Sequence, residues 1–246
     1  MDRQTRRQYL EAMGIQTWQL REAVLPMPAA GIELGTTPTA APPAEAAATL
    51  NNSPAGTEID NMDWPALEGN IRACTRCELH QTRTQAVPGV GNHQADVMVI
   101  GEAPGADEDQ QGEPFVGRAG KLLDQMLLAI GLKREAVYIS NIVKCRPPNN
   151  RDPRPEEAGA CEAYLQRQIR LVQPKVILAV GRIAAHNLLK TDQRVGALRG
   201  KDWTYTDTQT PVVVTYHPAY LLRSPAEKRK AWQDLLRARQ IVNAGA

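Results

Sequence analysis

Four short apolar runs, each followed by a glycine or a polar motif, recur along the chain beyond about residue 62. They cover 96–101, 137–143, 176–181 and 212–216, and their length and β-branched content predict buried strands. Amphipathic stretches predict helices at 119–130, 155–171, 182–189 and 226–242. This alternation is typical of βαβ units. We therefore predict an α/β fold, a three-layer sandwich whose central, mostly parallel four-stranded sheet is flanked by helices.

The N-terminal quarter of the chain has a different pattern. Residues 2–21 carry an apolar set suited to a helix, whereas 25–60 are rich in Ala, Pro, Thr and Gly and lack apolar periodicity. We predict a helical peptide over 1–24, a flexible linker over 25–60 and a globular domain over 61–246. The N-terminus lacks the apolar core of a secretory signal, and no run is long enough to span a bilayer. We expect a cytoplasmic monomer.

Composition and net charge do not indicate a partner. The chain is 42% hydrophobic and 23% charged with a net charge of +2, values that are ordinary for a globular protein. One loop is locally basic, because Lys144, Arg146, Arg151 and Arg154 are opposed there only by Asp152. A rigid basic loop of this kind often contacts phosphates. A second basic run lies near the C-terminus. A solvated helix face explains this run about as well as DNA binding does.

The chain contains four cysteines: Cys74 and Cys77 form a C-x-x-C pair, and Cys145 and Cys161 lie far downstream. In a reducing compartment, thiols in this pattern indicate metal ligands more readily than disulfides. Zinc sites usually have two closely spaced pairs, whereas iron–sulfur ligation tolerates uneven spacing. The spacing favours an iron–sulfur cluster, with zinc or four buried structural thiols as the alternatives.

A glycine or a polar motif follows each predicted strand. In an open α/β sheet, ligands bind beyond the carboxyl ends of the strands. Each motif alone is weak, because a glycine there is usually a turn and an asparagine is often a helix cap. Together they predict one site, because the topology brings strand ends to the same edge. In chain order the motifs are Gly101-Glu102, Asn141, Gly181-Arg182 and His217-Pro218.

Longer motifs around these positions carry a family resemblance. They are Gly101–Gly105 with Glu108-Asp109, Pro114–Gly120, Asn141–Pro148 and His217–Ala219. On these motifs, between about residues 63 and 236, the chain resembles the family 4 uracil-DNA glycosylases, iron–sulfur members of the uracil-DNA glycosylase superfamily. The resemblance implies excision of uracil from DNA, with the four cysteines ligating a structural 4Fe–4S cluster. A related family lacks a glutamate at position 102, and another carries a basic insertion after the phenylalanine motif that is absent here.

The resemblance and the chemistry together assign a uracil pocket. A glycosylase must extract the base from the stack, read its Watson–Crick edge and stack on its face. The amide of Asn141 would pair with uracil N3–H and O4. Phe115, the chain's only phenylalanine, would stack on the base from a loop outside the core, and Gly101 would complete the pocket.

Three further residues are candidates for the chemical step. Uracil leaves as a stabilised anion while the sugar gains oxocarbenium character. His217 would donate to the charge that develops on uracil O2. Glu102 would position water and stabilise the sugar cation. Glu108 would help to orient that water or crowd the C5 position, where thymine carries a methyl group.

The predicted DNA-phosphate contacts are Lys144, Arg146, Arg151, Arg182 and Arg223. Two alternatives remain open at this level. One is a glycosylase of relaxed specificity that acts on other deaminated bases such as hypoxanthine. The other is a non-catalytic iron–sulfur module that binds nucleic acid, and the presence of all the pocket residues argues against it.

The N-terminal peptide has a resemblance of its own. The pattern over Arg6–Arg21, which includes Trp18, is similar to the N-terminal peptide of the psi subunit of bacterial DNA polymerase III. That resemblance implies docking of residues 1–21 on the replicative clamp loader, with the linker raising the local concentration of the glycosylase. The alternative is an amphipathic helix that folds back on the domain.

Overall fold

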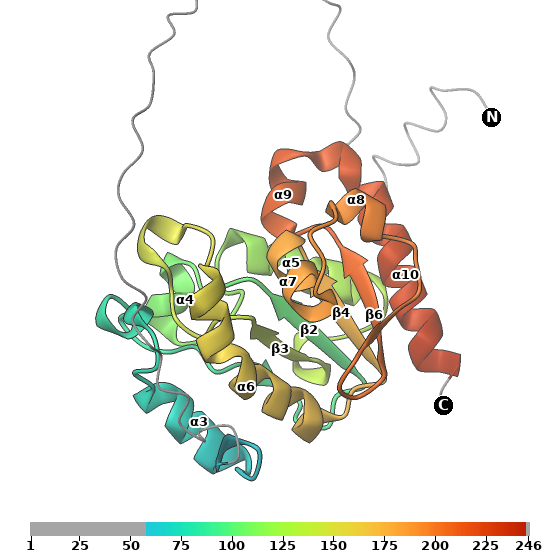
Figure 1. The fold of residues 1–246 in the computed structure, drawn as a ribbon. Coiled ribbons are helices and arrows are strands. Elements are labelled where there is room, and N and C mark those ends of the chain that lie inside the picture. The colour runs from blue at the N-terminus through green and yellow to red at the C-terminus, as the bar shows by residue number, and fades with distance from the viewer. Residues whose placement is uncertain (1–57, 245–246) are drawn as a thin grey trace, which may run out of the picture. The chain divides into compact units, whose positions relative to one another are not determined.

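A six-stranded sheet runs through residues 58–244, the part of the chain that the computed structural model describes (Figure 1). Its four central strands are parallel, and the strand at each edge is antiparallel to its neighbour. The predicted parallel core is confirmed, but the predicted count of four strands is wrong. The edge strands β1 and β5 are too short to give a period-two pattern. The order is β1 (Val90–Gly91), β3 (Tyr138–Asn141), β2 (Val97–Gly101), β4 (Val176–Val180), β6 (Thr210–Thr215) and β5 (Trp203–Tyr205).

The four predicted helices are present with boundaries that shift by at most two residues. They are α5 (Arg118–Ala129), α6 (Pro155–Val172), α7 (Arg182–Leu189) and α10 (Lys228–Ala244). Other helices were not predicted: α3 (Trp64–Ala73), α4 (Ala106–Gln111), α8 (Val195–Leu198), α9 (Pro218–Arg223) and the 3₁₀ turns η1 (Glu78–Gln81), η2 (Arg134–Ala136), η3 (Pro148–Asn150) and η4 (Pro225–Glu227). None of the described helices is long and apolar enough to cross a membrane.

Alternate side chains of the central strands enter two separate cores. On β2, Met98 and Ile100 pack into the core that includes α3, α6 and α7, whereas Val97 and Val99 pack into the core formed with α5, α9 and α10. Figure 1 shows α6 running along one side of the sheet and α10 alongside β6. Continuous apolar strands are expected when both faces of a sheet are covered. The predicted three-layer sandwich is confirmed.

The packed domain starts earlier than the sequence pattern indicated. Ile59 is 3% exposed within the first core, and the carboxylate of Asp60 lies 2.7 Å from Arg170 Nη1. Residues 58–60 therefore belong to the domain and not to the linker predicted over 25–60. The predictions for 1–24 and for 25–57 lie outside the described residues.

Candidate active site

A cleft of about 740 Å³ lies at the carboxyl edge of the parallel strands. Strand register places it there, because Gly101 at the end of β2 pairs with Asn141 at the end of β3, and Val180 of β4 pairs with Thr215 of β6. The segments that leave these strands therefore emerge side by side. The cleft is lined by most of the predicted strand-end motifs, namely Glu102, Asn141, Gly181, Arg182 and His217, together with Phe115 and Glu108.

Asn141 lines the cleft and has a buried, unpaired amide oxygen. Its side chain is 1% exposed, and Oδ1 has no hydrogen-bond partner among the described residues. Gly101 makes this arrangement possible. A Cβ on Gly101 would lie 2.5 Å from both Asn141 Oδ1 and Phe115 Cζ. The amide and the aromatic ring therefore pack directly against the backbone of β2, which only glycine permits at this position.

Phe115 lies on a loop, as predicted, but its ring is not outside the core. The residue is 6% exposed and packs in the second core, and its backbone has a left-handed φ of 54°. Gly120 in α5 accommodates this turn, because a Cβ there would lie 1.7 Å from the Phe115 carbonyl oxygen. One side of the ring is thus fixed by the core while the residue still lines the cleft.

His217 follows β6 and caps the N-terminus of α9. Its Nδ1 accepts a hydrogen bond from the Ala219 amide at 3.1 Å, so the neutral imidazole carries its proton on Nε2. Burial and, to a smaller extent, the nearby positive charge of Arg223 lower the pKa of His217 to about 4 against the opposing charge of Glu108. The ring centroid lies 5.6 Å from that of Phe115. The site therefore holds a neutral imidazole with one N–H to donate.

Glu102 belongs to a cluster of three charged side chains. Burial, together with the charge of Asp152 and a hydrogen bond shared with that carboxylate, raises the pKa of Glu102 to about 7 against the opposing effect of Arg182. Arg182 Nη2 forms an ion pair with Asp152 Oδ2. The sequence marked Asp152 only as the opposing charge of the basic loop. The cluster places a carboxyl group that titrates near neutral pH in the cleft.

Glu108 lines the cleft but is occupied by the backbone. Its Oε1 accepts the amides of Val116 at 3.0 Å and Gly117 at 3.1 Å, and its Oε2 accepts the amide of Gly105 at 3.0 Å. Both carboxylate oxygens therefore join the loop that carries Phe115 to the loop after β2. These contacts give Glu108 a structural role at the cleft, and its predicted part in orienting water or crowding the C5 position of the base stays a prediction.

Lys144 is not placed to contact DNA. The residue is 1% exposed, and its Nζ donates at 2.7 Å to Ser140 Oγ, to the Asn141 carbonyl and to Gln168 Oε1. Its position in a basic loop indicated exposure, but the chain turns inward as it leaves β3. The prediction that Lys144 binds phosphate is wrong.

The predicted phosphate-binding arginines are differently engaged. Arg151 forms a bidentate pair with Glu157 at 2.8 and 2.6 Å, and Arg146 Nε donates to Asn150 Oδ1 at 2.7 Å. Arg151, Arg182 and Arg223 line the cleft. Contact of Arg146, Arg151, Arg182 and Arg223 with DNA stays a prediction.

The four cysteines line one small pocket, although Cys77 and Cys145 are 68 residues apart in the sequence. Three of the sulfurs accept hydrogen bonds: Cys145 from Arg83 Nη1 at 2.9 Å, Cys161 from the Lys144 amide at 3.4 Å and Cys74 from the Arg76 amide at 3.5 Å. No sequence motif had marked Arg83 as a residue of this pocket. Residues 58–244 contain no group of three or more His, Cys, Asp or Glu side chains placed to hold a single metal ion.

The donor set suits a larger group than one ion. Burial raises the pKa of Cys161 to about 12, so its thiolate form needs a strong compensating positive charge. An iron–sulfur cluster supplies that charge and binds four thiolates around its own volume. Amide donors to the sulfurs are the surroundings such clusters have in proteins.

Comparison with known proteins identifies the family. Residues 88–236 match the family model described as the uracil DNA glycosylase superfamily. The chain is 48% identical to a type-4 uracil-DNA glycosylase of Archaeoglobus fulgidus over 67% of this chain and 85% of the relative, and 42% identical to one of Thermotoga maritima over 70% and 91%. It is 31% identical to a type-5 uracil-DNA glycosylase of Pyrobaculum aerophilum, over 55% and 66%. The chain belongs to the uracil-DNA glycosylase superfamily and, within it, to the type-4 enzymes.

Proposed function

We propose that this uracil-DNA glycosylase binds a flipped uracil in the cleft and hydrolyses the bond between the base and its deoxyribose, leaving an abasic site for repair. The type-4 relatives support the activity. The observation that carries the site is the unpaired amide oxygen of Asn141. A buried acceptor without a donor costs about 1–3 kcal/mol. Uracil N3–H supplies the missing donor, whereas cytosine presents an acceptor at N3.

The remaining cleft residues fit the chemical step. His217 donates its Nε2–H to uracil O2 as negative charge develops there, and its neutral form avoids a buried positive charge before the reaction. Glu102, on the loop after β2, takes up the proton of the attacking water or orients that water toward the sugar. Phe115 stacks on the base with its other side fixed in the core.

The cysteine pocket fits a 4Fe–4S cluster held by Cys74, Cys77, Cys145 and Cys161. When bound, the cluster supplies a structural crosslink between three segments. One precedes η1, one follows β3 and one lies in α6. All four cysteines line the cysteine pocket, and none of them lines the uracil cleft. Held by these cysteines, the cluster would fix the position of the loop after β3, and we assign it this structural role.

Single-turnover excision tests the assignment. The protein is incubated with oligonucleotides that carry a single uracil, hypoxanthine or cytosine, and alkali then reveals abasic sites. We expect cleavage at uracil, and an Asn141→Ala variant that loses about 10²-fold or more of the rate, as for removal of a specific polar contact. Wild-type activity of Asn141→Ala on uracil would refute the assigned role of Asn141. Excision of hypoxanthine by the wild-type protein at a rate comparable with that of uracil would show relaxed specificity.

We also propose that residues 1–21 dock on the replicative clamp loader, because their sequence resembles the psi peptide. Burial of Trp18 with a few aliphatic side chains could supply micromolar affinity, on the order of 8 kcal/mol. The deletion should stop at residue 57, since Ile59 belongs to the core. We expect Δ1–57 to excise uracil normally and to lose clamp-loader binding, and Trp18→Ala to lose most of it. Unchanged binding by either variant would refute the docking.

A further inference from the structure

The most unusual buried group outside the cleft is the ammonium of Lys144. Its three N–H donors meet three acceptors, Ser140 Oγ, the Asn141 carbonyl and Gln168 Oε1, each at 2.7 Å. No carboxylate forms an ion pair with it among the ion pairs of residues 58–244. A buried charge without a carboxylate partner is costly, so its hydrogen bonds must hold it in place.

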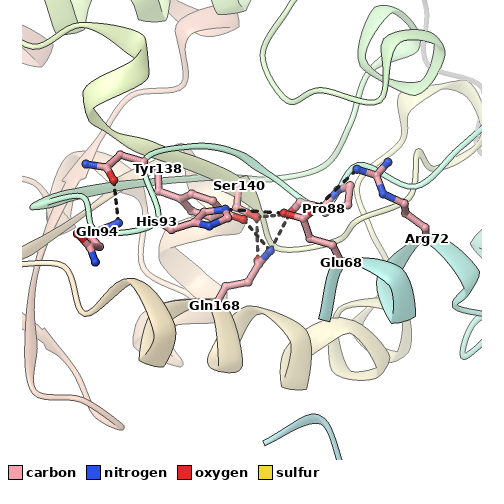
Figure 2. Close-up of polar contacts among 9 residues, drawn as sticks. Glu68, Arg72, Pro88, His93, Gln94, Tyr138, Ser140 and Gln168 are labelled. Atoms are coloured by element: carbon pink, nitrogen blue, oxygen red, sulfur yellow. Dashed lines mark hydrogen bonds and ion pairs between the residues drawn. The ribbon is translucent and has the colours of Figure 1, made fainter. Parts of the chain in front are cut away.

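The surroundings of the ammonium are themselves fixed. Gln168 Nε2 donates to the Pro88 carbonyl at 2.8 Å and to the Tyr138 hydroxyl at 3.1 Å, and Ser140 Oγ lies 3.0 Å from both the Pro88 carbonyl and Gln168 Oε1 (Figure 2). Figure 2 shows Ser140 and Gln168 directed toward each other, beside Tyr138 and Pro88. The network thus ties strand β3 to helix α6 and to the segment before β1.

Lys144 is also held through its backbone. Its amide donates to Cys161 Sγ at 3.4 Å, and its carbonyl accepts the Val87 amide at 2.7 Å. The next residue is Cys145, which lines the cysteine pocket. Any group that holds these two cysteines therefore also holds the backbone from which the Lys144 side chain turns back toward β3.

The contact with the Asn141 carbonyl reaches the uracil reader. The peptide unit between Asn141 and Ile142 is fixed at both ends, because its C=O accepts from Lys144 Nζ and its N–H donates to the Gly101 carbonyl at 2.9 Å. The orientation of this unit sets the backbone from which the Asn141 amide projects. Loss of the Lys144 contact would free one end of it.

We infer that Lys144 is a positioning residue, which holds the Asn141 backbone so that the amide is directed at uracil and which links that amide to the cysteine pocket. The inference rests on the proposed role of Asn141. It assigns Lys144 a task in base recognition, not in DNA binding. Removal of its side chain should therefore weaken recognition of the base while sparing contacts with the rest of the DNA.

The test compares two ligands of the iron-loaded full chain. The inhibition constant of free uracil measures base recognition by Asn141. The affinity for DNA with an abasic site measures the other contacts with DNA. We expect Lys144→Met to raise the inhibition constant of uracil about tenfold, in line with the loss of one charged hydrogen bond, with abasic-DNA affinity changed less than about twofold. Tyr138→Phe is the control, since the Tyr138 hydroxyl contacts Gln168 but not Lys144, and should leave both affinities unchanged.

Lys144→Met with wild-type uracil inhibition would overturn the inference, and so would a parallel loss of both affinities in folded, iron-loaded protein. If that variant does not accumulate in folded form, Lys144→Gln decides, because it lacks the charge and one donor. We expect uracil inhibition weakened at least about threefold, and a wild-type value would overturn the inference. Asn141→Ala distinguishes failure of the proposed function from failure of this inference. If Asn141→Ala is still inhibited by uracil as the wild type is, the proposed role of Asn141 is wrong. If only Lys144→Met is still inhibited in this way, the positioning role of Lys144 alone is wrong.

Discussion

The buried neutral histidine makes a quantitative prediction about stability and pH. His217 has a pKa of about 4 in the folded protein against an ordinary value near 6.5. Below pH 6.5 the unfolded chain takes up a proton that the folded chain refuses, so the free energy of unfolding must fall as the pH falls. The full loss is about 3 kcal/mol, of which about 2 kcal/mol is lost between pH 7 and pH 5.

His217→Asn provides the comparison. Asparagine keeps a side-chain oxygen that can cap α9 in place of Nδ1, but it does not titrate. We expect the wild-type free energy of unfolding minus that of the variant to decrease by about 2 kcal/mol between pH 7 and pH 5. Urea denaturation at fixed pH steps measures it, with both proteins iron-loaded so that the cysteine site and Glu102 cancel in the difference. A difference that is flat, or that grows toward pH 5, would show that the folded protein accepts the imidazolium.

Three further predictions concern the cleft and the cysteines. The single-turnover rate of excision should rise with pH through about 7 and then level, because Glu102 acts as a carboxylate. Glu102→Gln should abolish this rise and lower the rate about 10²-fold or more. A wild-type rate that does not change with pH would contradict the role. Gly101→Ala should raise the inhibition constant of uracil about tenfold or more, because the new methyl group displaces the Asn141 amide. Gly69→Ala is the control and should leave this constant unchanged, because a Cβ at Gly69 meets no other atom. Cys145→Ser should bleach the visible iron–sulfur absorbance and lower the melting temperature, and stoichiometric zinc without iron in wild-type protein would refute the cluster.

Sequence reasoning succeeded where the physical signal is continuous along the chain. The central strands are covered on both faces, so β2 and β4 are unbroken buried runs and β6 has an apolar centre, and parallel topology then brings the strand ends together. The edge strands β1 and β5 and the short helix α4 carry no such signal. Helix α4 contains no apolar residue after its first, and Glu108 stabilises its N-terminus by accepting the Gly105 amide.

The errors within the site have a common cause. Lys144 was assigned by its basic neighbours, and Phe115 by its position on a loop, although both side chains are buried. Local composition reports average exposure, whereas the direction of a side chain depends on contacts with distant segments. Arg83 shows the limit most clearly, because it donates to Cys145 Sγ across 62 residues of sequence. No local pattern marks such a pair.

Two buried polar side chains at and just after the end of β3 each lower the stability of the fold. Asn141 buries an acceptor without a donor, and Lys144 buries an ammonium without a carboxylate. An unconstrained amide would rotate until its oxygen found a donor. Here Gly101 and Phe115 pack against it, and Lys144 fixes its backbone, so rotation is opposed on each side. The unpaired oxygen is therefore held in place beside the Gly101 backbone, and in the proposed complex uracil would gain the hydrogen bond without having to reorganise the protein.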